Sequence, residues 1–167
     1  MLQNYTSANT SVNSTKVPAV FRMADFREGT LNLDLGGGKY DTATYFLAKR
    51  GVVNEIIDPY NRSEAENAIA EWSIEACGGA DTCTISNVLN VINSRNGRIS
   101  CLMGAWARMK VGGICYITVY EGDRSGIGRE TKKDCWQNNK KLKNYYSEVY
   151  EVFGNAHILG KMIVAVK

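Results

Sequence analysis

The stretch LNLDLGGGKYD, from Leu31 to Asp41, constrains the fold more than any other part of this chain. An apolar, strand-like run passes directly into Gly36, Gly37 and Gly38, and a helix-forming segment follows at once. Glycine has no Cβ atom, so such a turn can take positive φ and let a ligand approach the backbone. The helix after the turn offers unpaired N–H groups at its start. The turn therefore predicts a ligand site, and features further along the chain indicate which ligand it binds.

Strand-like and helix-like runs alternate through most of the chain. We expect strands at residues 31–35, 53–57, 82–86 and 114–120, with helices between them at about 42–50, 64–76 and 99–109. This alternation predicts an α/β fold with a mostly parallel sheet covered by helices on both faces. A basic segment at 121–143 is expected to be irregular or helical, and strand-like runs at 148–153 and 158–166 predict a C-terminal antiparallel hairpin.

The helix expected at 64–76 has a clear start signal and an apolar side. Ser63 and Glu66 have the spacing of a capping box. One helical face carries apolar residues that we expect to pack on the core, namely Ala65, Ala68, Ile69, Trp72 and Ala76.

Composition limits the organisation of the chain. At 167 residues, 44% of them hydrophobic, we expect a single domain over residues 17–167, preceded by a polar arm or lid at 1–16. Five scattered cysteines and one histidine indicate reduced thiols and no metal site. The chain has neither a long apolar run nor a signal peptide, which predicts a cytoplasmic protein that does not enter a membrane.

Polar and glycine residues lie at the end of each of the four predicted parallel strands or directly after it. In a parallel sheet the carboxyl ends of the strands share one edge, where ligands bind. The sequence therefore predicts one shared cleft built from Asp34 with Gly36–Gly38, Asp58–Tyr60, Ser86–Asn87 and Glu121–Asp123.

Taken together, these motifs resemble the class I (Rossmann-like) S-adenosylmethionine-dependent methyltransferases. The likeness runs from about Leu31 to Lys167 and rests on four features: the run LDLGGG, the acid Asp58 after the second strand, the turn MKVGG that ends at Gly113, and the C-terminal hairpin. The resemblance implies a three-layer Rossmann-like sandwich of six to seven strands, with S-adenosylmethionine as cofactor.

The resemblance also implies roles for individual residues. Asp34, Gly36, Gly37 and Gly38 would lie against the methionine moiety and ribose, and Asp58, followed by Tyr60, would accept hydrogen bonds from both ribose hydroxyls. Ser86 and Asn87 would shape the floor beneath the sulfonium.

Two departures from the family pattern stand out. Tyr40 occupies a position where the family has a further glycine, and only about 23 residues separate Asp58 from Thr82. The family's third strand is thus expected to be shortened or missing, which leaves adenine recognition unassigned. Asp81 or the Gly78–Gly79 turn are the candidates.

The basic segment carries the candidates for the acceptor side. Glu121 and Asp123 are the candidate general bases, with Tyr120 a weaker one. Arg124, Trp136 and Asn138 are candidate substrate-binding residues, because an aromatic face beside amides and cations suits a nucleobase and its phosphate. The simpler alternatives are a packed Trp136 and a solvated basic face.

We therefore expect S-adenosylmethionine-dependent methyl transfer to a small-molecule, nucleotide or nucleic-acid acceptor, with a second copy or a partner chain as a candidate to complete the acceptor site. The alternatives are a non-catalytic module that binds S-adenosylmethionine or another nucleoside, and an enzyme that degrades the cofactor.

Overall fold

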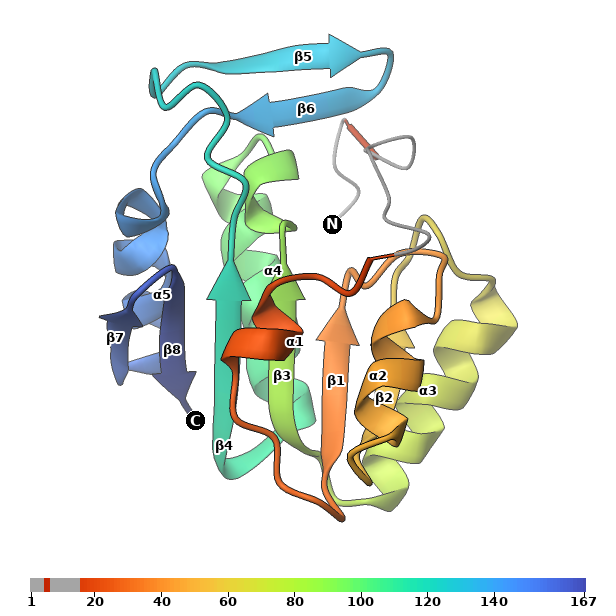
Figure 1. Cartoon of the computed structure of the whole chain (residues 1–167). Coiled ribbons are helices and arrows are strands. Elements are labelled where there is room, and N and C mark those ends of the chain that lie inside the picture. The colour runs from red at the N-terminus through yellow and green to blue at the C-terminus, as the bar shows by residue number, and fades with distance from the viewer. Residues whose placement is uncertain (1–4, 7–15) are drawn as a thin grey trace.

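A computed structural model describes residues 5–6 and 16–167 of the chain. It contains a six-stranded sheet in the order β2-β1-β3-β4-β8-β7 (Figure 1). The first four strands in this order are parallel, and β8 and β7 are antiparallel to their neighbours. The strands are β1 (Leu31–Leu35), β2 (Val53–Ile57), β3 (Ala80–Ser86), β4 (Met109–Thr118), β7 (Ala156–Leu159) and β8 (Met162–Val166). The predicted sheet is confirmed, with β2 at its edge where the family's third strand would pair.

Helices cover both faces of this sheet, as predicted. Two of them, α1 (Val20–Met23) and α2 (Thr42–Ala48), lie on one face (Figure 1). The other three, α3 (Glu64–Ala76), α4 (Arg95–Arg108) and α5 (Tyr146–Phe153), lie on the opposite face. Among the described residues, no helix combines the length and the apolar character that crossing a bilayer requires.

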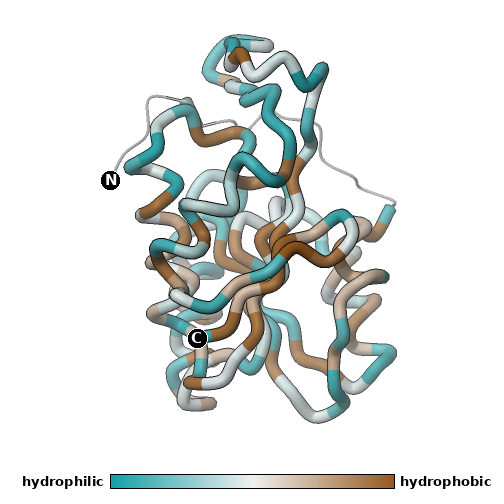
Figure 2. The backbone as a smooth tube through the Cα atoms, turned by 90° about the vertical axis from the view of Figure 1, so that its left-hand side faces the viewer, coloured by the Kyte–Doolittle hydropathy of each residue, from teal (hydrophilic) through white to brown (hydrophobic). Residues whose placement is uncertain are grey.

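An apolar cluster fills each interface between sheet and helices. The larger one, beneath α3, α4 and α5, includes Leu33, Ile74 and Leu102, and the smaller one, beneath α1 and α2, includes Phe21 and Leu47. Burying each such side chain stabilises the fold by about 1.5–3 kcal/mol. Figure 2 shows this hydrophobic character along the strands of the sheet.

A row of buried polar side chains also crosses the sheet. The Asn32 side-chain amide donates to Asn54 Oδ1 at 2.7 Å and to Thr84 Oγ1 at 3.0 Å. Thr82 Oγ1 in turn donates to Asn32 Oδ1 at 2.8 Å. These bonds satisfy the buried groups and join β2, β1 and β3 side by side, so the residues that follow these strands are held in a fixed relation.

The structure confirms the start of α3 but not its predicted packing. Ser63 and Glu66 form the expected capping box. The predicted buried face is wrong, because Trp72 on that face is 71% exposed, whereas Ala70 and Ile74 are buried. The cause is the position of α3, which packs against the edge strand β2 through a narrow stripe of side chains.

Two C-terminal predictions need correction. Residues 148–153, predicted as a strand, belong to α5, and the antiparallel hairpin is formed by β7 and β8 instead. The segment at 121–143, predicted to be irregular or helical, contains a second hairpin of β5 (Gly128–Lys132) and β6 (Cys135–Asn138). This hairpin stands beyond the carboxyl edge of the large sheet (Figure 1), and Figure 2 shows mostly hydrophilic residues along it.

Candidate functional site

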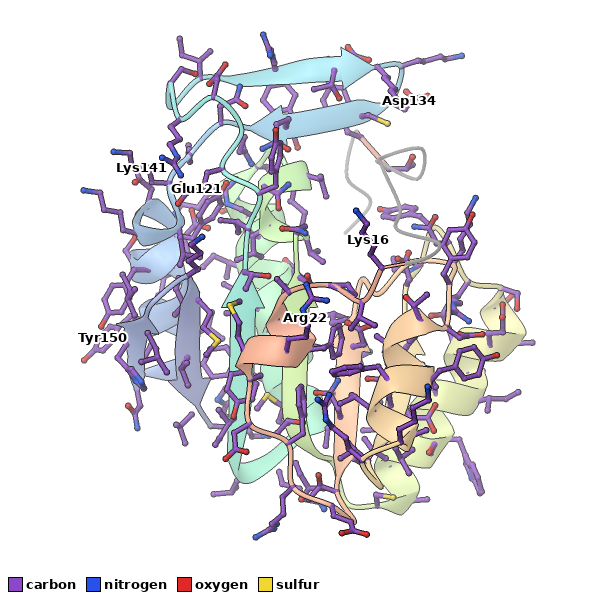
Figure 3. The ribbon with its side chains drawn as sticks, viewed as in Figure 1. Lys16, Arg22, Glu121, Asp134, Lys141 and Tyr150 are labelled. Atoms are coloured by element: carbon purple, nitrogen blue, oxygen red, sulfur yellow. The ribbon has the colours of Figure 1, made fainter. Side chains whose placement is uncertain are left out.

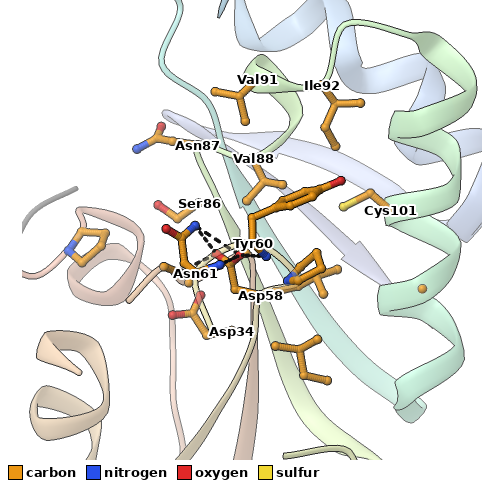
Figure 4. A pocket seen from close by; sticks show the side chains of 18 of the residues that line it. Asp34, Asp58, Tyr60, Asn61, Ser86, Asn87, Val88, Val91, Ile92 and Cys101 are labelled. Atoms are coloured by element: carbon orange, nitrogen blue, oxygen red, sulfur yellow. Dashed lines mark hydrogen bonds between the residues drawn. The ribbon is translucent and has the colours of Figure 1, made fainter. Parts of the chain in front are cut away.

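A cavity of about 530 Å³ opens at the carboxyl edge of the parallel strands. The ends of β1, β2 and β3, the turns that follow them and one side of α4 form its lining (Figure 4). All of the residues that the sequence suggests for cofactor binding lie in this lining: Asp34, Gly36, Gly37, Gly38, Asp58, Tyr60, Ser86 and Asn87. The parallel topology brings them together, as expected for strands that end at one edge.

The glycine turn after β1 depends on its lack of side chains. Gly36 and Gly38 have φ values of 74° and 79°, in the left-handed region that favours glycine. A Cβ atom on Gly36 would collide with the Val88 side chain, and one on Gly37 would collide with the Asp34 carboxylate. The turn therefore presents bare backbone to the cavity, directly above a buried acid.

That acid, Asp34, is buried and only partly satisfied by the protein. Asp34 is only 2% exposed, and Thr84 Oγ1 donates a hydrogen bond to Asp34 Oδ1 at 3.1 Å. None of the described residues donates a hydrogen bond to Oδ2, which lies under Gly37. Burial raises the pKa of Asp34 from 3.8 to about 7, repulsion from Asp58 adds to the rise, and the Thr84 hydrogen bond opposes it. Such a carboxyl group favours a ligand that brings positive charge and N–H donors.

The second acid, Asp58, joins the glycine turn to the turn after β2. Its Oδ2 accepts a hydrogen bond from Gly38 N at 2.9 Å, and its Oδ1 accepts from Tyr60 N at 2.9 Å and Asn61 N at 3.0 Å. The side-chain amide of Asn61 lies 3.2 and 3.1 Å from the two carboxylate oxygens (Figure 4). One amide group thus spans both oxygens, as the two hydroxyls of a ribose would.

Sequence reasoning missed both Asn61 and its neighbour Arg62. Arg62 Nε donates to the Gly38 carbonyl at 2.8 Å, and its Nη2 pairs with Asp41 at 2.7 Å. Arg62 therefore fixes the end of the glycine turn to the start of α2. The spacing of 21 residues between Asp41 and Arg62 is too long to be recognised as a pair in a single sequence.

Ser86 ends β3 and Asn87 follows it, on the neighbouring side of the cavity. Asn87 has a φ of 58°, an uncommon conformation for a residue other than glycine. Its backbone N–H donates to the Thr118 carbonyl at 2.9 Å, which ties the end of β3 to the end of β4. The chain then enters a short 3₁₀ helix, η1 (Leu89–Val91), beside which Val88 and Ile92 add apolar lining to the cavity.

The candidate bases lie outside the cavity lining. Glu121 accepts a hydrogen bond from Leu142 N at 2.8 Å and pairs with Arg124 at 2.7 Å. The Leu142 hydrogen bond, followed by the charge of Arg124, lowers the pKa of Glu121. Figure 3 shows Glu121 beside Lys141. Asp123 is exposed, and its hydrogen bonds with Ser125 lower its pKa. Both carboxylates are therefore held in turns of their own segment.

The candidate acceptor residues contact different parts of the structure. Arg124 is exposed and paired with Glu121. Asn138 is buried: its amide donates to the Ile92 carbonyl at 2.8 Å, and its Oδ1 accepts from Trp136 Nε1 at 2.8 Å. The half-buried Trp136 ring packs over Gly128 of β5. Asn138 thus attaches the β5–β6 hairpin to the part of the chain that lines the cavity.

Little of the predicted arm or lid at residues 1–16 can be placed. Residues 1–4 and 7–15 lie outside the described residues. Thr6 belongs to the cavity lining, and the Tyr5 ring lies 5.2 Å from the Trp136 ring.

The two adenine-binding candidates are at the wrong edge of the sheet. Asp81 lies at the start of β3, where it accepts from Leu31 N at 2.9 Å and pairs with Lys110 at 2.9 Å. Gly78 and Gly79 precede β3 at that same edge. The prediction was wrong because it used nearness in sequence, whereas the cavity opens at the carboxyl ends of the strands.

Comparison with known proteins supports the fold. No family model matches the sequence, and no curated protein matches it either. Among solved structures, PigF with SAH is 17% identical, with a TM-score of 0.61 over 90% of this chain and 54% of that one. The Burkholderia thailandensis 1,6-didemethyltoxoflavin-N1-methyltransferase, with bound 1,6-didemethyltoxoflavin and S-adenosylhomocysteine, is 15% identical, with a TM-score of 0.59 over 84% and 72%. The [4+2]-cyclase SpnF is 14% identical, with a TM-score of 0.55 over 84% and 57%.

This chain therefore has the Rossmann-like fold of class I S-adenosylmethionine-dependent methyltransferases, as the sequence predicts. It spans about half the length of PigF. Because a cyclase shares the fold, the reaction has to be argued from the site.

Proposed function

We propose that this chain binds S-adenosylmethionine in the cavity and transfers its methyl group to a small-molecule, nucleotide or nucleic-acid acceptor. The observation that carries the proposal is the presence of two buried carboxyl groups, Asp34 and Asp58, on either side of one three-glycine turn. Structures with the same fold that contain S-adenosylhomocysteine (SAH) support this choice of ligand.

The cavity residues match the chemical parts of such a ligand. The free oxygen of Asp34 can accept hydrogen bonds from the ammonium group of the methionine part. Asp58 can accept from the two ribose hydroxyls once the Asn61 amide moves aside. The turn at Gly36–Gly38 lets the ligand lie against backbone, and Ser86 and Asn87 border the remaining space.

Methyl transfer makes limited demands on the protein. The sulfonium centre supplies its own leaving group, so the chain has to hold an acceptor in line with the methyl carbon and accept any proton that it loses. Glu121 and Asp123 stay the proposed bases for an acceptor that must be deprotonated. Their lowered pKa values make each a weak base, so the proposal favours acceptors that need little help with deprotonation.

The β5–β6 hairpin and the segment around it are proposed to receive the acceptor. Residues 124–143 contain seven Arg or Lys and two acids, which favours an anionic acceptor such as a nucleotide or single-stranded nucleic acid. Trp136 and Arg124 are the proposed contacts. Asn138 would act through the position of the hairpin, since its side chain is already bonded to Trp136 and Ile92. A second copy or a partner chain could complete this compact site.

Two measurements, made one after the other, test the proposal. Calorimetry with S-adenosylmethionine and S-adenosylhomocysteine should give saturable binding to the folded protein, and absence of heat at millimolar ligand would refute the proposed cofactor. Transfer of a radiolabelled methyl group is then measured to small-molecule extracts, mononucleotides and oligonucleotides. Binding without transfer to any of these would favour the non-catalytic module, and methylthioadenosine released from the cofactor alone would favour a degrading enzyme.

A further inference from the structure

The β5–β6 hairpin is anchored beside the cavity by buried amide side chains. Gln137 Nε2 donates to the Tyr120 carbonyl at 3.0 Å, and the Asn90 side chain donates to Gln137 Oε1 at 3.1 Å. Asn138 donates to the Ile92 carbonyl at 2.8 Å, and Ile92 lines the cavity. Because these groups are buried and satisfied, the hairpin keeps a fixed position relative to the cavity.

The hairpin presents an exposed and basic surface. All of residues 129–134 are exposed. Five lysines, called the hairpin lysines below, form no ion pair with any residue that the structure describes: Lys132, Lys133, Lys140, Lys141 and Lys143. By contrast, Arg98 and Arg108 of α4 pair with Glu148 and Glu71. Because like charges repel one another, a concentration of unpaired lysines favours an anionic partner.

The hairpin lysines form two groups at opposite ends of the hairpin. Lys132 and Lys133 lie at the turn between β5 and β6, and the other three follow β6. Figure 3 shows Asp134 at this turn and Lys141 toward the other end. At about 3.3 Å for each residue, the chain from Lys133 to Lys140 spans roughly 20 Å. A mononucleotide carries its phosphates at one end and contacts one group, whereas the phosphates of a polynucleotide repeat along the chain and can contact both.

Two aromatic side chains accompany the hairpin where it approaches the cavity. Tyr120 is 63% exposed, and its carbonyl is the one that Gln137 holds. The half-buried Trp136 ring lies 5.2 Å from the ring of Tyr5, whose neighbour Thr6 lines the cavity. Every nucleobase has a flat π face, so an exposed ring can stack on a base with little dependence on sequence. Tyr120 is therefore the candidate stacking surface.

We propose that the acceptor is a single-stranded polynucleotide whose phosphates contact both groups of hairpin lysines, while one of its bases stacks on Tyr120 at the approach to the cavity. This inference rests on the proposed function and selects one acceptor class from those that it leaves open. A single strand is favoured over a duplex, because a base that reacts in a cavity has to leave the duplex stack.

Fluorescence anisotropy with labelled single-stranded DNA and RNA of random sequence, about 12 nucleotides long, tests the lysine contacts. The double variant Lys132→Gln with Lys133→Gln should weaken binding about ten-fold. It should also lower the magnitude of the slope of log K against log salt concentration by about 0.7 for each lysine. The control, Lys49→Gln with Lys161→Gln, removes the same charge from exposed positions outside the hairpin and should leave both quantities unchanged.

Substitutions at Tyr120 test the stacking contact in the same assay. Tyr120→Ala should weaken oligonucleotide binding about ten-fold, and Tyr120→Phe, which keeps the ring, should retain native affinity. Tyr45→Ala removes a similarly exposed ring from α2 and should have no effect. Thermal unfolding of each variant verifies that it is folded, since all of the substituted side chains are exposed.

Competition and calorimetry separate this inference from the proposed function. Mononucleotides at an equal phosphate concentration should not displace the oligonucleotide, and oligonucleotides should accept the radiolabelled methyl group. Displacement by mononucleotides, an unchanged affinity in the Lys132→Gln/Lys133→Gln variant, or an equal loss in the control pair would overturn the polynucleotide acceptor while S-adenosylhomocysteine still binds in calorimetry. If the native protein binds no S-adenosylhomocysteine, the proposed function itself fails.

Discussion

Asp34 makes a quantitative prediction possible, because its ionisation is linked both to stability and to ligand binding. Burial raises its pKa from 3.8 to about 7. At about 1.4 kcal/mol for each pH unit, this difference corresponds to about 4 kcal/mol for ionising Asp34 in the folded protein without ligand. The Thr84 hydrogen bond offsets only part of the lost hydration.

The effect on stability follows from the pH at which the folded and the unfolded chain each release the Asp34 proton. The unfolded chain loses the Asp34 proton near pH 3.8 and the folded chain near pH 7, so between these values the folded state holds more protons. The contribution of this group to the free energy of unfolding is therefore fully present below pH 3.8 and is lost as the pH rises to about 7. Urea unfolding of the native protein and of Asp34→Asn across this range should give a difference curve that falls by up to about 4 kcal/mol.

Ligand binding should show the opposite trend. A ligand ammonium group pairs with ionised Asp34. The affinity for S-adenosylhomocysteine should therefore rise as the pH increases, by up to ten-fold for each pH unit until about pH 7, and then level off. Calorimetry measures this affinity, and 5′-methylthioadenosine, which lacks the α-amino group of the homocysteine part, is the matched control. A flat profile for S-adenosylhomocysteine, or an equal rise for the control ligand, would refute the pairing of Asp34 with the ammonium group.

Four further substitutions test other contacts. Asp58→Ala should weaken S-adenosylhomocysteine binding by about 1.5–3 kcal/mol in calorimetry, the scale of a hydrogen bond to a charged group. Asn61→Ala should tighten the same binding, because the Asn61 amide competes for both Asp58 oxygens, and lower the unfolding free energy by about 1 kcal/mol in urea. Arg98→Ala leaves the buried Glu148 carboxylate unpaired and should lower that free energy by about 3–5 kcal/mol. Trp136→Ala should leave cofactor affinity unchanged but reduce methyl transfer in the radiolabel assay.

Local signals made much of the fold and part of the site predictable. The apolar run before Gly36–Gly38 and the capping box at Ser63 are contained within a few residues, so a single sequence shows them. Asp34 and Asp58 could be brought to one cavity because parallel strands end at a common edge. A separation of 24 residues does not by itself indicate that these two acids meet. The parallel arrangement of their strands does indicate it.

The missed features depend on contacts between distant segments. In residues 148–153, Val149 and Phe153 are buried at helical spacing, but this run is too short for its period to be distinguished from a strand. Trp72 was misplaced because the apolar residues of α3 occupy two sides, and only the edge strand decides which side is buried. Neither Asn61 nor the side of α4 that lines the cavity has a local signature, because distant segments of the chain bring them to the cavity.

The hairpin and the cavity are coupled through the same short helix. Gln137 of β6 accepts a hydrogen bond from Asn90 of η1 at 3.1 Å, and Asn138 donates to the Ile92 carbonyl just after η1. Ile92 itself lines the cavity on the side of α4. A change at Asn138 would therefore alter both the position of the hairpin and the Ile92 side of the cavity, whereas a change at Trp136 removes one hydrogen bond to Asn138 and leaves the bond from Asn138 to the Ile92 carbonyl in place. Trp136 is therefore the more informative of the two residues for the acceptor, because its loss should disturb the cavity less than the loss of Asn138.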